Sequence, residues 1–314
     1  MELSDRIGRR LRLHDLHVFM AVVQAGSMNK AAMLLNTGQS AISRSIADLE
    51  GAIGVRLLDR SPQGVAPTEY GRALLSGGAA MFDDLRQAVK KIEHLSDPAA
   101  GEVRVGSIIP LAASFVYAVI DRLSRRHPRI VFDLVITAQD ALHRELSERN
   151  VDLLVAWKSG PDADERLVFE FLYDDSYVVV AGKQNPWTRR RKVKLAELVS
   201  ESWTLPPPNS VLGAAIVEAF RVSGLPQPRA SVVTMPGEVR TKLLATGRFL
   251  SIFPASALKF TTERPKLQIL PVALPLARLP VGIVTLKNRT LSPVAQLFIE
   301  HAREVAKPLA KRKS

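Results

Sequence analysis

Apolar residues near the start of the chain follow the spacing of short helices. Intervals of three and four predict an amphipathic helix that ends near Gly26, with a buried side formed by Leu16, Phe19, Met20 and Val23. Ser27 is a suitable N-cap for a second short helix, which ends at residues 36–38. We therefore predict a compact all-α unit at the N-terminal end.

A third helix is predicted to begin at Gln39. Its buried line is apolar and consists of Ile42, Ile46, Leu49 and Ile53, while the residues facing outward are Gln39, Ser40, Ser43, Arg44 and Ala47. Short polar side chains beside one guanidinium fit the major groove of DNA, where they hydrogen-bond to base edges or phosphates. The alternative is a solvated helix face, which typically carries Glu and Lys four residues apart. This face has no such pair.

The next segment is GVRLLDRSPQGVAPTEYG. Its turn-forming residues Pro62, Gly64 and Pro67 predict a short β-hairpin. Arg60 lies at the base of this hairpin and Gln63 near its tip. A hairpin in this place is a wing, and its arginines are expected to contact the DNA backbone and fix the register without reading the sequence.

A longer helix is predicted from Thr68 to residue 97, where Ser96-Asp97-Pro98 ends it. Its apolar residues alternate spacings of four and three, which favours pairing with a second copy of the same helix. The residues predicted to pair are Leu74, Met81, Leu85, Ala88 and Ile92. The alternative is a helix that packs only on its own domain.

From residue 101 onward, strand-like and helix-like segments alternate, which predicts βαβ units on a parallel sheet and hence an α/β fold. Two strand-like runs meet around residues 173–175 with no helix between them, as expected where a chain crosses from one lobe to another. A second α/β series follows, and an extended segment returns to a last helix at residues 293–305.

Two such lobes imply a ligand cleft at the carboxyl ends of their strands. By position, we expect the cleft to be lined by Ser107, Ala138, Gln139, Trp157, Asn209, Ser210, Met235 and Phe253. Ordinary loop packing is the alternative for each of them. Two helix N-termini facing one cleft favour an anion. A small carboxylate or a sugar acid is therefore favoured over a neutral sugar.

Charge and cysteine content narrow the functional class. The chain of 314 residues carries a formal net charge of +12, but residues 1–70 are nearly balanced, so most of the excess lies in residues 71–314. Bulk charge is thus a poor argument for DNA binding. The chain has no cysteine, which suits a reducing compartment, and it shows no signal peptide or membrane span. We expect a cytoplasmic protein without membrane association.

Enzyme signatures are missing from the sequence. There is no H-E-x-x-H, G-x-S-x-G, Walker A or G-x-G-x-x-G motif after a strand. His14 and His17 share a helix face, yet no third metal ligand lies near them in sequence. We therefore expect no catalytic residues, no metal site and no cofactor.

Several co-spaced motifs, GSMNKAA, QSAISRSIADLE, GVRLLDR and APTEYG, make residues 13–75 resemble the winged helix-turn-helix of LysR-type transcriptional regulators. The resemblance implies DNA contacts by Gln39, Ser40, Ser43 and Arg44, with Arg60, Gln63 and Ser27 beside them. The chain departs from the family pattern at Gly38, Ser40 and Leu58, where Ser or Thr, Pro and Phe are usual. A weaker start of the third helix is expected, with binding retained.

The C-terminal region resembles, more weakly, the effector domain of the same family, which is similar to periplasmic solute-binding proteins. SWTLPPPNSVL resembles the subgroup named for a galactose-binding-protein regulator, although Gly213 stands where an arginine is common. The resemblance implies a DNA-binding domain at 1–67, a dimerisation helix at 68–97 and an effector domain at 101–314. The first lobe would comprise 101–174 and 272–314, and the second 175–271.

The resemblance also implies partners: a double-stranded promoter operator, a small-molecule effector, and further copies in a homodimer that pairs into a homotetramer. RNA polymerase is a further candidate partner. Two other functions stay open from the residues alone. One is a solute-binding protein with a helical extension, and the other is a DNA-binding protein indifferent to sequence.

Overall fold

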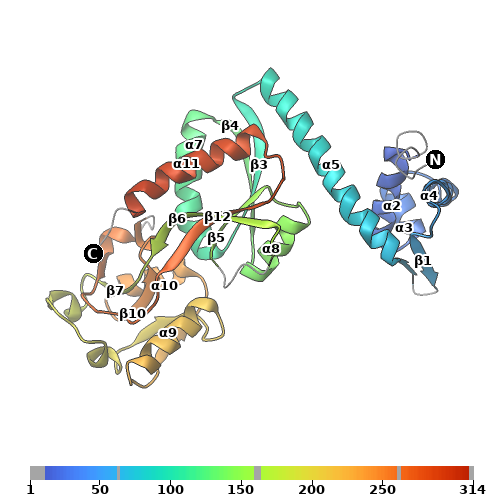
Figure 1. Cartoon of the computed structure of the whole chain (residues 1–314). Helices are drawn as coiled ribbons and strands as arrows, with labels where there is room; N and C mark the ends of the chain where they lie inside the picture. Colours follow the sequence, from blue (N-terminus) through green and yellow to red (C-terminus); the bar gives the residue numbers. More distant parts are fainter. Residues whose placement is uncertain (1–10, 62–63, 159–163, 260–262, 311–314) are drawn as a thin grey trace. The chain divides into compact units, whose positions relative to one another are not determined.

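The computed structural model describes residues 11–61, 64–158, 164–259 and 263–310. The chain forms two compact units, Met1–Arg86 and Gln87–Ser314, which are described separately here. The division falls inside one continuous helix, α5 (Glu69–Ser96), so each unit contains part of it (Figure 1). The domain boundaries expected from the sequence stay a prediction, and the structure adds that the linker helix is shared between the units.

The first unit is a three-helix arrangement followed by a hairpin. It contains α2 (Leu13–Ala25), α3 (Met28–Leu34) and α4 (Gln39–Ile53), then β1 (Leu58–Ser61) and β2 (Gly64–Pro67). Gly26 and Gly54 end α2 and α4 in the left-handed region, with φ of 63° and 89°, which glycine adopts without steric cost. The turn at Gly26 agrees with the predicted end of the first helix, and the turn at Gly54 is an addition from the structure.

The second unit contains two five-stranded sheets. The first has the strand order β4-β3-β5-β12-β6, formed by β3 (Ala100–Ser107), β4 (Arg129–Ile136), β5 (Leu153–Trp157), β6 (Leu167–Asp175) and β12 (Leu279–Leu286). The helices of this lobe are α6 (Ile109–Leu111), the π-helical turn η1 (Ala112–Val116), α7 (Tyr117–Arg126), α8 (Gln139–Ser147) and α11 (Pro293–Ala310).

The second sheet has the order β11-β7-β10-β8-β9. Its strands are β7 (Tyr177–Gly182), β8 (Trp203–Leu205), β9 (Ala230–Val233), β10 (Leu250–Pro254) and β11 (Leu267–Ile269). Two α-helices, α9 (Val211–Val222) and α10 (Gly237–Ala245), accompany four short 3-10 turns: η2 (Pro186–Arg189), η3 (Leu195–Leu198), η4 (Ala257–Lys259) and η5 (Arg264–Lys266).

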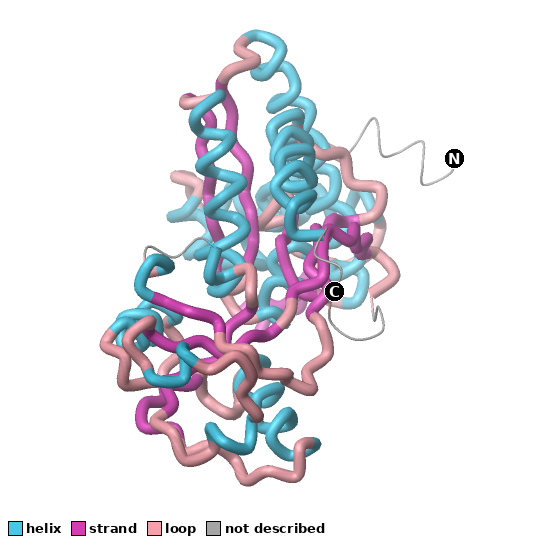
Figure 2. The backbone as a smooth tube through the Cα atoms, turned by 90° about the vertical axis from the view of Figure 1, so that its left-hand side faces the viewer, coloured by secondary structure: helices cyan, strands magenta, loops and turns pink. Residues whose placement is uncertain are grey.

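The chain passes between the two sheets twice. The first passage is a single residue, Ser176, between β6 and β7, at the place where the sequence predicts a crossing. The second runs through residues 270–278, which form neither helix nor strand. Figure 2 draws all such loop segments in pink, among the cyan helices and magenta strands. These returns make both sheets mixed: β12 is antiparallel to β5 and β6, and β7 is antiparallel to β10 and β11. The expectation of a purely parallel sheet is therefore too simple.

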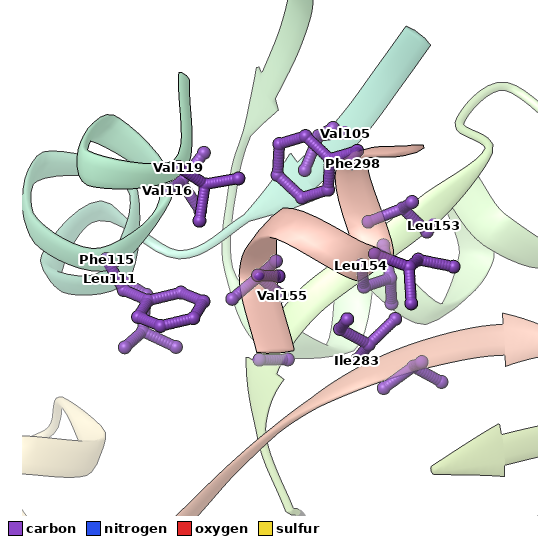
Figure 3. Packing of buried hydrophobic residues seen from close by; sticks show 14 of the residues in the cluster. Val105, Leu111, Phe115, Val116, Val119, Leu153, Leu154, Val155, Ile283 and Phe298 are labelled. Atoms are coloured by element: carbon purple, nitrogen blue, oxygen red, sulfur yellow. The ribbon is translucent and has the colours of Figure 1, made fainter. Parts of the chain in front are cut away.

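The core of the first lobe lies between its sheet and the helices. β3 pairs in parallel with β4 and β5 on its two sides, so right-handed crossovers place α7 and α8 on opposite faces. α11 packs beside α7 (Figure 1). Branched side chains of β3 and β5, such as Val105 and Leu153, belong to the same buried cluster as Phe298 of α11, whose ring lies beside Val105 in Figure 3.

A buried carboxylate, Asp152, fastens the end of α5 to this lobe. Its side chain accepts hydrogen bonds from the Arg104 backbone N–H at 2.9 Å and from Arg289 Nη2 at 3.1 Å. Gln87 Nε2 and Lys90 Nζ, both on α5, lie 3.5 and 3.7 Å from its oxygens. The Asp152 and Arg289 side chains are 1% and 0% exposed. The pair therefore lies in a low-dielectric interior.

We expect Asp152→Asn to lower the free energy of unfolding of the second unit by roughly 3 to 5 kcal/mol, because it leaves the buried Arg289 without a counter-charge. Chemical denaturation measures the effect. The matched control is Asp121→Asn, which breaks the exposed Asp121–Arg125 pair and is expected to change stability little. Equal effects of the two substitutions would contradict this account.

Candidate functional site

The exposed face of α4 is built by one-sided burial. Ile42, Ile46 and Leu49 are buried against α2 and α3, while Gln39, Ser40 and Arg44 are exposed and Ser43 is half-buried. Gly38 is the N-cap residue and has no side chain to cap with, so the first N–H groups of α4 receive no side-chain bond. The four predicted side chains thus share one accessible helix face.

A carboxylate on α4 holds the hairpin in place. Glu50 Oε1 accepts hydrogen bonds from the backbone N–H groups of Leu57, at 2.7 Å, and Leu58, at 3.3 Å. Both donors belong to buried residues at the start of β1. Glu50 therefore sets the position of the hairpin relative to α4. The sequence analysis missed this role, because the sequence does not indicate which backbone N–H groups an acidic side chain in a helix will accept hydrogen bonds from.

The β1–β2 hairpin has the expected wing topology, with Arg60 paired opposite Val65 and its side chain exposed. Gly64, at φ of 131°, lies against the end of α2, where a Cβ atom would come within 2.8 Å of the Gly26 carbonyl oxygen. The Val65 N–H donates to that same oxygen at 2.9 Å. Gln63, the predicted tip residue, lies outside the described residues.

Ser27 occupies the N-cap position of α3 in an extended conformation, as predicted, but its hydroxyl makes no capping hydrogen bond in the described chain. Its side chain is half-buried.

Helix α5 uses its apolar residues in two ways. Leu74, with Leu75 and Phe82, packs against the core of the first unit, so at this position the alternative of packing within its own domain applies. Further along, the apolar side chains are exposed: Met81 40%, Leu85 49%, Val89 46%, Ile92 63% and Leu95 74%. Ala88 is exposed as well. These six residues are called the α5 stripe below.

The predicted ligand residues of the first lobe lie close together. The Ser107 hydroxyl donates to the Val155 carbonyl at 2.8 Å, and Gln139 Nε2 donates to the Trp157 carbonyl at 2.8 Å. Ser107 and Trp157 are 1% and 5% exposed. Trp157 Nε1 has no acceptor among the described residues. Ala138, the N-cap of α8, is exposed. Ser107 is thus committed to packing, whereas the Trp157 indole N–H is free.

In the second lobe, Ser210 caps α9: its hydroxyl accepts from the Gly213 N–H at 3.1 Å and donates to the Pro207 carbonyl at 2.7 Å. A Cβ atom at Gly213 would lie 1.9 Å from that carbonyl oxygen. The backbone of this chain therefore leaves no room for a side chain at position 213. Asn209 is exposed beside the cap.

The other two predicted residues of this lobe differ in exposure. Met235 is 41% exposed, and Phe253 is 4% exposed beneath the guanidinium of Arg240, at 4.2 Å from ring centroid to Cζ. Arg240 was missed because nothing in the sequence marks an arginine in a helix as buried. Among the described residues, no hydrogen bond joins the predicted residues of one lobe to those of the other.

The passage at Ser176 is held by a buried carboxylate that the sequence analysis also missed. Asp175, 2% exposed, accepts hydrogen bonds from the Ser256 backbone N–H at 3.1 Å and from the Ser256 hydroxyl. The Ala255 N–H donates to the Ser176 carbonyl at 2.7 Å. Burial raises the pKa of the Asp175 carboxyl, although the bonds from Ser256 oppose this shift. The passage from β6 to β7 is therefore fixed by hydrogen bonds to the segment that follows β10.

Comparison with known proteins identifies this combination. Residues 13–72 match the model of the bacterial regulatory helix-turn-helix proteins of the lysR family, and residues 96–307 match the LysR substrate binding domain. The chain belongs to the LysR family of transcriptional regulators. Its two LysR domains are the helix-turn-helix DNA-binding domain and the effector-binding substrate domain, so the fold and function that the resemblance implied are confirmed.

Relatives of this LysR-family chain are similar over nearly their whole length. It is 26% identical over 297 residues to the transcriptional regulator GbpR of Azospirillum brasilense. The aligned region covers 94% of this chain and 86% of GbpR. It is 27% identical over 293 residues to the transcriptional dual regulator GltC of Bacillus subtilis, covering 92% and 96% of the two chains. The comparisons support neither the solute-binding alternative nor the sequence-indifferent one.

Solved structures share the fold of this LysR-family chain. A full-length OxyR variant from Pseudomonas aeruginosa matches with a TM-score of 0.67 at 19% identity, over 97% of this chain and 99% of that one. CbnR crystallised with its target DNA matches with a TM-score of 0.52 at 21% identity, over 95% and 100%. Within the described residues, no helix has the length and apolar character needed to cross a membrane.

We expect Glu50→Ala to destabilise the first unit by roughly 1 to 3 kcal/mol, because it leaves the N–H groups of Leu57 and Leu58 unsatisfied next to the core. Thermal unfolding measures this loss. Asp48→Ala is the matched control, since it removes the same charge from an exposed position on the same helix. If the two variants unfold at the same temperature, Glu50 does not stabilise the hairpin.

Proposed function

We propose that this LysR-family regulator reads a promoter operator through Gln39, Ser40, Ser43 and Arg44, while Arg60 and Ser27 contact the DNA backbone. The observation that carries this proposal is the one-sided burial of α4. Ile42, Ile46 and Leu49 face the core, while the accessible side presents Gln39, Ser40, Ser43 and Arg44 together with alanines and Asp48, and no bulky apolar side chain. Such a face enters a major groove without steric obstruction. The wing beside it presents Arg60 outward.

The α5 stripe supports a homodimer, the next part of the proposal. Exposed apolar side chains along one helix face are costly in water unless another surface covers them, and spacings of three and four suit an identical helix. A two-fold pair presents two recognition helices to two half-sites, which doubles the base and phosphate contacts. A tetramer of two such dimers and a contact with RNA polymerase remain part of the proposal, on family resemblance alone.

A small-molecule effector modulates this regulator, and its binding residues come from both lobes of the second unit. Effector binding changes DNA binding or activation only if the ligand prefers one arrangement of the lobes over another. Ser107, Ala138, Gln139, Trp157, Asn209, Ser210, Met235 and Phe253 are the proposed lining. A small carboxylate, sugar acid or sugar is the proposed effector. The protein acts in the cytoplasm, where its DNA target lies, and it catalyses no reaction.

We expect Arg44→Ala to weaken binding to the promoter region upstream of the protein's own coding sequence by roughly tenfold or more, because a guanidinium contact to a base or phosphate is lost. Fluorescence anisotropy at fixed salt measures the affinity. Arg125→Ala, which removes an exposed arginine from α7, is the control and is expected to bind normally. Unchanged affinity in Arg44→Ala would refute the assignment of α4.

We expect Leu85→Glu to shift the protein toward monomers and to weaken operator binding in parallel, because two glutamates would face each other across the paired stripe. Sedimentation velocity measures the mass. Lys91→Glu, on the same helix but outside the stripe, is the control. If Leu85→Glu stays dimeric at the concentration where wild type does, the pairing surface lies elsewhere.

A further inference from the structure

The second lobe buries an arginine against the end of β10. Arg240 of α10 is 4% exposed, and its guanidinium lies over the ring of Phe253. One nitrogen, Nη1, donates to the Ser251 hydroxyl at 3.3 Å and to the Ile252 carbonyl at 3.2 Å. The Ser251 hydroxyl in turn donates to the Thr204 carbonyl at 2.7 Å. These contacts fix one edge of the guanidinium and orient the whole group.

The other edge has no partner. Among the residues that the structure describes, no carboxylate pairs with Arg240, and its buried Nε has no acceptor. The acidic groups nearest along the chain are engaged elsewhere: Glu238 pairs with Lys242, Glu218 with Arg221 and Glu263 with Lys266. Burial lowers the pKa of Arg240 to about 10, which still leaves it positively charged at neutral pH.

The same chain shows how a buried guanidinium is otherwise satisfied. Arg289, equally inaccessible, has Asp152 at 3.1 Å and two backbone carbonyls as acceptors. A buried cation without an anion carries a large desolvation cost. Arg240 therefore has an incomplete environment, and a bound anion would complete it.

The start of α10 lies beside the same ring. Gly237, its first residue, is close enough that a Cβ atom there would lie 3.6 Å from Phe253 Cε1. The N-cap residue is Pro236, and no side chain caps the helix. The first N–H groups of α10 and the positive end of its dipole are thus near the guanidinium, and both favour a negative charge.

We propose that Arg240 binds the carboxylate group of an organic effector, through its Nε and Nη2 edge, with Phe253 as the apolar floor. A planar carboxylate matches two parallel N–H donors of a guanidinium, and the aromatic ring and the half-exposed Met235 suit a carbon skeleton better than an inorganic anion. This inference rests on the proposed effector function and names the ligand class and the residue that selects it.

Isothermal titration of the full-length protein with benzoate and succinate, against benzamide and succinamide, tests the proposal. We expect at least one carboxylate to bind and its amide to bind at least tenfold more weakly. Arg240→Gln should weaken binding of that carboxylate at least tenfold, and Arg240→Lys should restore part of the lost affinity. Arg248→Gln, an exposed arginine near the end of the same helix, is the matched control and should bind as wild type does.

Three results would overturn the proposal: no carboxylate binds, Arg240→Gln binds it as wild type does, or inorganic phosphate binds as tightly as the carboxylate. If Arg240→Gln does not fold, Arg240→Lys and the comparison of acids with amides in wild type decide the question. A crystal soaked in benzoate should place the carboxylate against Nε. Operator binding without any carboxylate depends on α4, so it distinguishes a failure of this inference from a failure of the proposed function.

Discussion

One-sided packing of α4 is the constraint on which the DNA-binding unit depends. Ile42, Ile46 and Leu49 supply the apolar contacts with α2 and α3, and because they lie on one face, the opposite face needs no role in folding. It is free to carry side chains that would be poor choices in a core. Glu50 extends the same helix's influence to the hairpin by accepting two backbone N–H groups. Fold stability therefore depends on one face of the helix, and the DNA contacts that we propose lie on the other face.

Buried charge plays two different roles in the larger unit. Asp152 and Arg289 neutralise each other and hold the end of α5 on the first lobe, a structural use of a buried ion pair. Asp175 is satisfied by Ser256 at the passage between sheets. Arg240 differs from Asp152, Arg289 and Asp175: within the described residues it has neither an opposite charge nor an acceptor for its Nε. The contrast separates groups that complete the fold from one that a ligand would complete.

The sequence predicted most of what local patterns control. The helix end at Gly26, the hairpin and the alternation of strands and helices follow from spacing and turn chemistry, and the structure has them. It could not show that Leu74 packs inward while Leu85 stays exposed, because both fit one heptad line. The antiparallel strands and the burial of Arg240 depend on contacts between distant segments, which periodicity does not record.

The shared helix has a consequence for how binding events are linked. The α5 stripe extends from Met81 to Leu95, across the point where the chain divides into its two units, and Asp152 holds the same turns from behind. If the α5 stripe pairs with a second copy as we propose, anything that strains those turns changes the dimerisation constant. Thermodynamic reciprocity then requires that whatever captures the paired form also changes the strain on the lobe. By this route, a duplex with two half-sites would change the affinity of the second unit for its ligand.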